Sequence, residues 1–119
     1  MFKVDGYLIT LSRGDTGAIK IIADTDYTFA ETDRALFSVK NAVGEIVKQQ
    51  AFALDASNSF TVTIFNSDTD SLSPGSYTWD VRYVINPYYD SNGNIIDGDQ
   101  VITPHLPMEM QLLNVVGEI

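Results

Sequence analysis

Few residues of this 119-residue chain could do chemistry, and most of those that could are acidic. Sixteen Asp and Glu stand against seven Lys and Arg, and His105 is the sole histidine. A lone histidine between Pro104 and Pro107 is more typical of a strand end than of a general base, and no serine lies in a Gly-x-Ser-x-Gly elbow. We therefore expect no enzymatic activity and no catalytic residue.

Two acidic stretches carry the oxygen ligands that Ca²⁺ prefers. In the first, residues at alternate positions resemble the opening of a calcium loop, but Ile95 and Val101 stand where an EF-hand has its turn glycine and its bidentate glutamate. An EF-hand is excluded, and we predict no resident metal or other cofactor. The candidate ligands of a looser site are Asp90, Asn92, Asn94 and Asp97. The second stretch contains Asp24, Asp26, Glu31 and Asp33.

Arg13-Gly14-Asp15 is the tripeptide that integrins bind. It lies between two alternating apolar runs, where glycine and aspartate favour a tight turn. A tripeptide by itself carries little information. We interpret this one as a turn between two strands rather than as an adhesion signal.

Composition and charge exclude several classes of partner. The net charge of −9 repels the phosphate backbone and anionic lipid, and without cysteine there can be no disulfide or thiolate zinc site. No apolar run approaches the roughly 20 residues that span a bilayer, and the first residues lack secretory features. We expect one folded domain over residues 1–119, made in a cytoplasm, without nucleic-acid or membrane partners.

Alternation with a period of two residues dominates the pattern and predicts an all-β fold. In "YTWDVRYVI", residues 77–85, the aromatic and apolar side chains fall on one strand face. Weaker alternation recurs near residues 7–11, 19–23, 37–39, 60–64 and 108–112. Turn signals follow at Asn41 to Gly44, at Pro74-Gly75 as a type II turn, and at Asn92-Gly93 as a type I′ turn. Residues 86–99 are expected to form a projecting hairpin.

Leu72, Gly75 and Tyr77 have the spacing of the tyrosine corner of Greek-key sandwiches, in which the tyrosine hydroxyl bonds to an upstream backbone group. Trp79 shares a strand face with Tyr77 and is therefore assigned to the core rather than to a sugar-binding surface. The predicted core is Phe37, Val62, Ile64, Trp79 and Tyr83.

Surface contacts are predicted at two places. Tyr88 and Tyr89 could form an exposed patch on the projecting hairpin, because tyrosine offers contact area at low entropic cost. The closing strand, which contains Met108 and Met110, is expected at a sheet edge with Glu109 as its guard charge. An uncovered edge of this kind would pair with another chain.

Four segments together resemble a known family: "RGDTGAIKI", "LFSVKN", "DTDSLSPGSYTWDVRY" and "ITP". This pattern is similar to the N-terminal immunoglobulin-like domain of phage baseplate upper proteins and related tail proteins of phages that infect Gram-positive hosts. The resemblance spans residues 9–112. It implies an immunoglobulin-like Greek-key sandwich of about seven to nine antiparallel strands.

The resemblance also implies a function. We expect a non-enzymatic structural and interaction module of a phage or prophage tail, located in the virion, whose partners are other tail or baseplate proteins or further copies of itself. The alternative is a carbohydrate- or receptor-binding module that uses Tyr88, Tyr89 and the acidic loop, with or without calcium.

Overall fold

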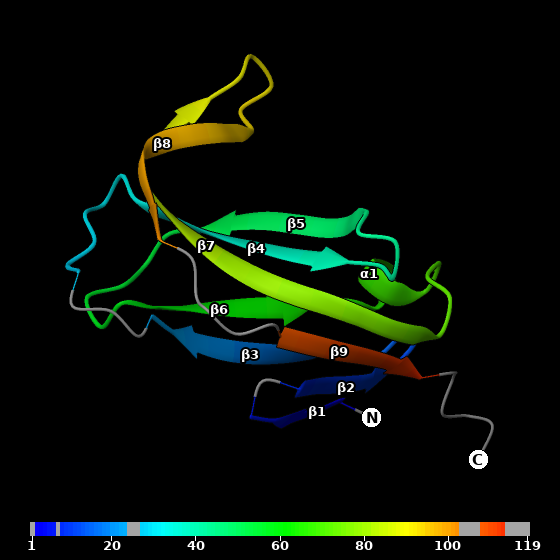
Figure 1. Cartoon of the computed structure of the whole chain (residues 1–119). Helices are drawn as coiled ribbons and strands as arrows, with labels where there is room; N and C mark the ends of the chain where they lie inside the picture. The colour runs from blue at the N-terminus through cyan, green and yellow to red at the C-terminus, as the bar shows by residue number, and fades with distance from the viewer. Residues whose placement is uncertain (1, 7, 24–26, 103–107, 114–119) are drawn as a thin grey trace.

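The computed structural model describes residues 2–6, 8–23, 27–102 and, for the backbone alone, 108–113. Within these residues the chain forms nine strands and one short helix (Figure 1). In chain order they are β1 (Phe2–Asp5), β2 (Leu8–Ser12), β3 (Gly17–Ile22), β4 (Arg34–Lys40), β5 (Ile46–Phe52), β6 (Ser59–Ile64), α1 (Asn66–Thr69), β7 (Gly75–Tyr89), β8 (Ile95–Ile102) and β9 (Met108–Leu113).

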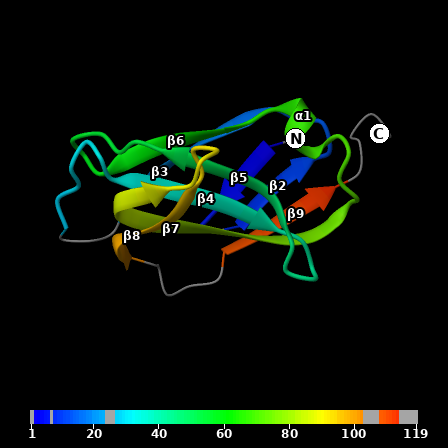
Figure 2. The same cartoon turned by 90° about the horizontal axis from the view of Figure 1, so that it is seen from above.

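The strands form two sheets, so the predicted all-β fold is confirmed. The larger sheet has the order β1-β2-β9-β7-β4-β5, with β8 attached to β7, and the smaller consists of β3 and β6. All pairs are antiparallel except β2 and β9, which run parallel. Figure 1 shows β3 and β6 beneath β4, β5 and β7, while β9, β2 and β1 continue the large sheet below them, and Figure 2 shows the same strands from above.

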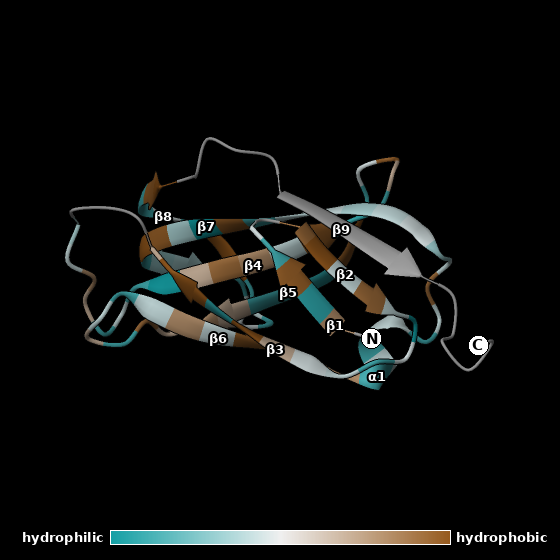
Figure 3. Ribbon diagram, turned by 90° about the horizontal axis from the view of Figure 1, so that it is seen from below, coloured by the Kyte–Doolittle hydropathy of each residue, from teal (hydrophilic) through white to brown (hydrophobic). Residues whose placement is uncertain are grey.

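One core lies between the two sheets. It joins Ile9 and Leu11 of β2 to side chains of β4, β6 and β7, and the rings of Phe37 and Trp79 lie 5.7 Å apart. All five residues of the predicted core are at most 6% exposed. Hydrophobic and hydrophilic bands alternate along the strands (Figure 3), because neighbouring side chains of a strand point to opposite faces.

The turns follow the sequence signals in part. Gly44 closes the β4–β5 hairpin with φ 86°, as predicted. The type I′ prediction for Asn92-Gly93 is wrong, since Gly93 has φ 81° but Asn92 has no positive φ, and type I′ requires both. The type II prediction is also wrong, because Gly75 begins β7 with φ 146°, far from the roughly 80° of that turn.

The closing strand is not an edge. β9 lies between β2 and β7 and pairs with both, so the prediction that Met108 and Met110 stand on an open edge is wrong. The strand that covers this side of β9 is β2. The chain folds back at Gly6 into a β1–β2 hairpin, which the alternation did not predict. No helix among the described residues is long and apolar enough to cross a bilayer.

The tyrosine corner is confirmed. The hydroxyl of Tyr77 donates a hydrogen bond of 2.6 Å to the backbone oxygen of Ser73, four residues upstream. Tyr77 is 8% exposed, so its ring lies in the core while its hydroxyl fixes the segment that leads into β7.

Replacing Tyr77 with phenylalanine should lower the free energy of unfolding by about 1 kcal/mol, because one partly buried hydrogen bond is lost while the ring stays in place. The matched control is Tyr89→Phe, since Tyr89 is 50% exposed and lies on the projecting hairpin. Chemical denaturation of both variants measures the difference. Equal stability of Tyr77→Phe and the parent would show that the corner does not stabilise the fold.

Candidate interaction site

The prominent surface feature is a two-stranded arm, residues 86–102, built from the end of β7 and from β8. It rises from the large sheet and extends over the outer face of β4 and β5 (Figures 1 and 2). The predicted projecting hairpin is therefore confirmed. The radius of gyration is 14.9 Å, against the about 13.5 Å expected for a compact chain of this length, as a projecting arm requires.

The arm bends away from the sheet at Asn86, which has φ 48°. A buried carboxylate holds this bend: Asp33, 2% exposed, accepts a hydrogen bond of 2.9 Å from the Asn86 amide through Oδ1. Its Oδ2 accepts a hydrogen bond of 2.7 Å from the amide of Ala30. Asp33, predicted as a candidate cation ligand, is thus engaged by backbone amides on both of its oxygens.

The other strand of the arm bends at Gly98, which lies opposite Pro87. A Cβ at this position would stand 2.5 Å from Val84 Cγ1 and 2.7 Å from the backbone oxygen of Ile85. Glycine is needed here because the two strands approach too closely for any side chain.

Tyr88 and Tyr89 are 47% and 50% exposed, so their predicted exposure is confirmed. They are consecutive in β7, so their side chains point to opposite faces of the arm and cannot stack together on one ligand. The Tyr88 hydroxyl donates a hydrogen bond to Asp99 Oδ1, and Asn86 Nδ2 donates one of 2.9 Å to Oδ2.

The hydrogen bond between Tyr88 and Asp99 shifts the pKa of both side chains. The hydrogen bond to Asp99 raises the pKa of the Tyr88 hydroxyl. Donation from Tyr88, and then from Asn86, lowers the pKa of the Asp99 carboxyl. Asp99 thus accepts two side-chain hydrogen bonds on one face of the arm.

The acidic spacing that suggested a calcium site belongs to the loop at the tip of the arm, where Asp90 forms hydrogen bonds within the loop. Asp90 Oδ1 accepts hydrogen bonds of 2.9 Å from the amides of Asn92 and Asn94, and the backbones of Asp90 and Asn94 pair. The same arrangement recurs where Asn41 and Asp55 begin loops of equal length, with Gly44 and Asn58 at positive φ. The carboxylate of Asp90 is thus used to close a turn.

The other predicted ligands do not converge. Asp97 Oδ1 accepts the amide of Gly98, and Glu31 is exposed, whereas Asp33 is buried beneath the arm. Among the residues that the structure describes, no three acidic, histidine or cysteine side chains form a group that could hold a metal ion. Asp24, Asp26 and His105 lie outside the described residues.

The Arg13-Gly14-Asp15 segment is a turn, as predicted. The amide of Asp15 donates to the oxygen of Ser12 at 3.0 Å, and Gly14 has φ 88°. The Gly14 amide also donates to Thr69 Oγ1 at 2.9 Å, which attaches the turn to α1. The tripeptide is a connection between β2 and β3 that packs on the body of the domain.

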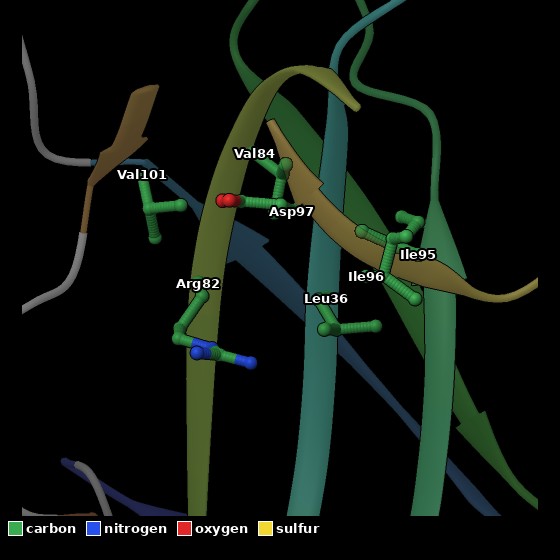
Figure 4. A pocket seen from close by; sticks show the side chains of 7 residues that line it. All are labelled: Leu36, Arg82, Val84, Ile95, Ile96, Asp97 and Val101. Carbon is green, nitrogen blue, oxygen red and sulfur yellow. The ribbon is translucent and has the colours of Figure 1, made fainter. Parts of the chain in front are cut away.

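Beneath the arm lies a hollow of about 50 Å³ that the sequence did not reveal (Figure 4). Its walls come from β4, β7 and β8, and β7 pairs with both of the other strands. They are lined by Leu36, Arg82, Val84, Ile95, Ile96, Asp97 and Val101. The consecutive apolar residues Ile95-Ile96, which break the alternation, were the one signal that could have indicated it.

Replacing Asp33 with alanine should release the bend. We expect the free energy of unfolding to fall by about 1–3 kcal/mol, because two backbone donors lose their acceptor, and amide exchange at Asn86 to accelerate. Asp97→Ala is the control, since its carboxylate is exposed and, within the described part of the chain, accepts only the adjacent amide. Unchanged exchange at Asn86 would show that Asp33 does not hold the arm.

Calorimetry should show no tight calcium binding. Asp90→Ala should instead loosen the tip by about 1 kcal/mol through lost hydrogen bonds, whereas Asp90→Asn should be nearly neutral because Asn41 closes an equivalent loop. A micromolar calcium site that Asp90→Ala abolishes would contradict this assignment.

A comparison with known protein families gives no match, and neither does a comparison with curated proteins. Function must therefore be argued from the arm, the hollow beneath it and the fold that carries them.

Proposed function

We propose that the chain is an immunoglobulin-like β-sandwich that acts as a structural and interaction module of a phage or prophage tail. The strand path supports this fold: β3 and β6 lie in one sheet, and β4, β5 and β7 in the other. The B, C, C′, E and F strands of variable-type immunoglobulin domains are divided in the same way. The tyrosine corner at the start of β7 adds to the likeness.

The single observation that carries the interaction role is the arm. Of the large apolar side chains that stand exposed, four are on it: Tyr88, Tyr89, Ile96 and Val101. Exposed apolar side chains that occur singly are normal, but a group on one projecting element is typical of a binding surface. Its mechanism is surface complementarity, without a chemical step. The tail assignment itself rests on the resemblance of the "RGDTGAIKI" and "SPGSYTWDV" segments to baseplate upper proteins.

The proposal is tested by purifying the chain together with the tail proteins encoded beside it and measuring complex formation by light scattering. We expect a stable complex that the double substitution Tyr89→Ser, Ile96→Ser weakens about tenfold or more, as for truncated interface anchors. The control is Ile22→Ser, because Ile22 is 65% exposed on β3, away from the arm.

Three results would contradict the proposal. One is the absence of a complex with every neighbouring tail protein, and another is turnover of a substrate. The third is chelator-sensitive binding on a glycan array, which would favour the carbohydrate-binding alternative.

A further inference from the structure

The arm carries an open strand edge. β8 pairs with β7 along one side, and within the described residues no strand pairs with its other side. β4 pairs with β7 only as far as Val84, so the arm is a ribbon of two strands beyond that point. Unpaired backbone groups on such a ribbon are a template for another strand.

The negative charge of the arm limits which strands could pair with the open edge of β8. Residues 86–102 contain three aspartates and no lysine or arginine, and no lysine or arginine follows Arg82 in the sequence. In a second copy, pairing edge to edge would bring Asp97 and Asp99 towards the same residues of its partner. Like charges oppose that arrangement, whereas a basic strand would be attracted.

The hollow gives the same edge an apolar anchor point. Ile96 is 66% and Val101 41% exposed at its rim, while Leu36 and Val84 are 6% and 3% exposed within it. Figure 4 shows Ile95 and Ile96 on one side, Val101 on the other, and Arg82 extending away from Asp97. A space of about 50 Å³ exceeds the roughly 10–15 Å³ that holds one water molecule, so a small apolar group can enter.

We propose that the arm and its hollow bind an extended, basic segment of another protein, which adds as a strand along β8. An apolar side chain of that segment enters the hollow between Ile96 and Val101. Its lysine or arginine side chains pair with Asp97 and Asp99. Alternation along β8 places Asp97, Asp99 and Val101 on one face, so the basic residues and the apolar residue of the added strand stand at alternate positions on that same face. This inference rests on the proposed role as an interaction module and names the chemistry of its partner.

The test uses three dye-labelled heptapeptides and fluorescence polarisation at physiological salt, where non-specific attraction to an acidic protein is screened. The probe is acetyl-Thr-Lys-Thr-Lys-Thr-Val-Thr-amide, in which both lysines and the valine lie on one strand face. One twin has glutamate in place of every lysine, and the other has proline in place of the second and third threonines, which removes backbone donors and keeps the lysines and the valine. We expect the lysine peptide to bind at least about tenfold more tightly than either twin.

Variants of the full chain locate the binding. Asp97→Lys and Ile96→Ser should each weaken the lysine peptide by about tenfold, as for central anchors. Asp70→Lys makes the same charge change at an exposed position after α1, and Ile22→Ser removes an equally exposed isoleucine from β3. These controls should change the affinity by less than about twofold, as expected of residues outside the contact. A thermal melt of each variant checks that it remains folded. If Ile96→Ser is unstable, Val101→Ser is used in its place.

The outcomes are distinct. Equal binding of the proline twin overturns strand addition, and equal binding by Asp97→Lys overturns the acidic contact. Failure of all three peptides, or dimerisation of the chain through the arm in sedimentation, overturns the proposal as a whole. In each of these cases the complex with neighbouring tail proteins, if it forms, leaves the interaction role standing on a different contact.

Discussion

The pairing of β7 with three other strands is the constraint on which the rest of the structure depends. Its 15 residues pair with β4 along one side, and with β9 and then β8 along the other. The first half therefore belongs to the sheet and the core, with Trp79 and Tyr83 facing inward. The second half leaves the sheet and forms the arm. β7 must therefore bend between its two halves while it keeps its backbone hydrogen bonds to the neighbouring strands.

Three local features make that bend possible, and each has a physical cause. Asn86 adopts a positive φ, which asparagine tolerates better than most side chains. Its amide points to the buried Asp33 carboxylate, so the bend leaves that donor satisfied. Gly98 allows the partner strand to follow closely, where a methyl group would meet the backbone of Ile85. Because Asp33 comes from the loop before β4, the arm is tied to the body by a residue more than fifty positions away in sequence.

The parts of the fold that depend on local pattern were predictable from sequence. Alternation located β7 and the core, and the spacing of Leu72, Gly75 and Tyr77 identified the tyrosine corner. The position of β9 was not predictable, because nothing in its own residues shows that β2 returns beside it in parallel. The hollow was missed for the same reason: Leu36 of β4 and Ile95 of β8 line it from strands that are far apart in the sequence. Local chemistry specifies strands and turns, whereas neighbours across the sheet are set by the whole chain.

The β5 edge of the large sheet and the edge of the arm differ in the charged side chains that they carry. At the edge of the large sheet, Lys48 of β5 forms an ion pair of 3.2 Å with Asp68 of α1, so a charge that could guard that edge is engaged within the domain. On the arm, Asp97 is exposed and accepts a hydrogen bond, among the described residues, only from the adjacent amide, and no lysine or arginine follows Arg82 in the sequence. A negative guard discourages pairing between identical copies but does not discourage a basic strand. Asp97 and Asp99 therefore oppose pairing of the ribbon with a second copy and, in the interaction that we propose, attract a partner of opposite charge.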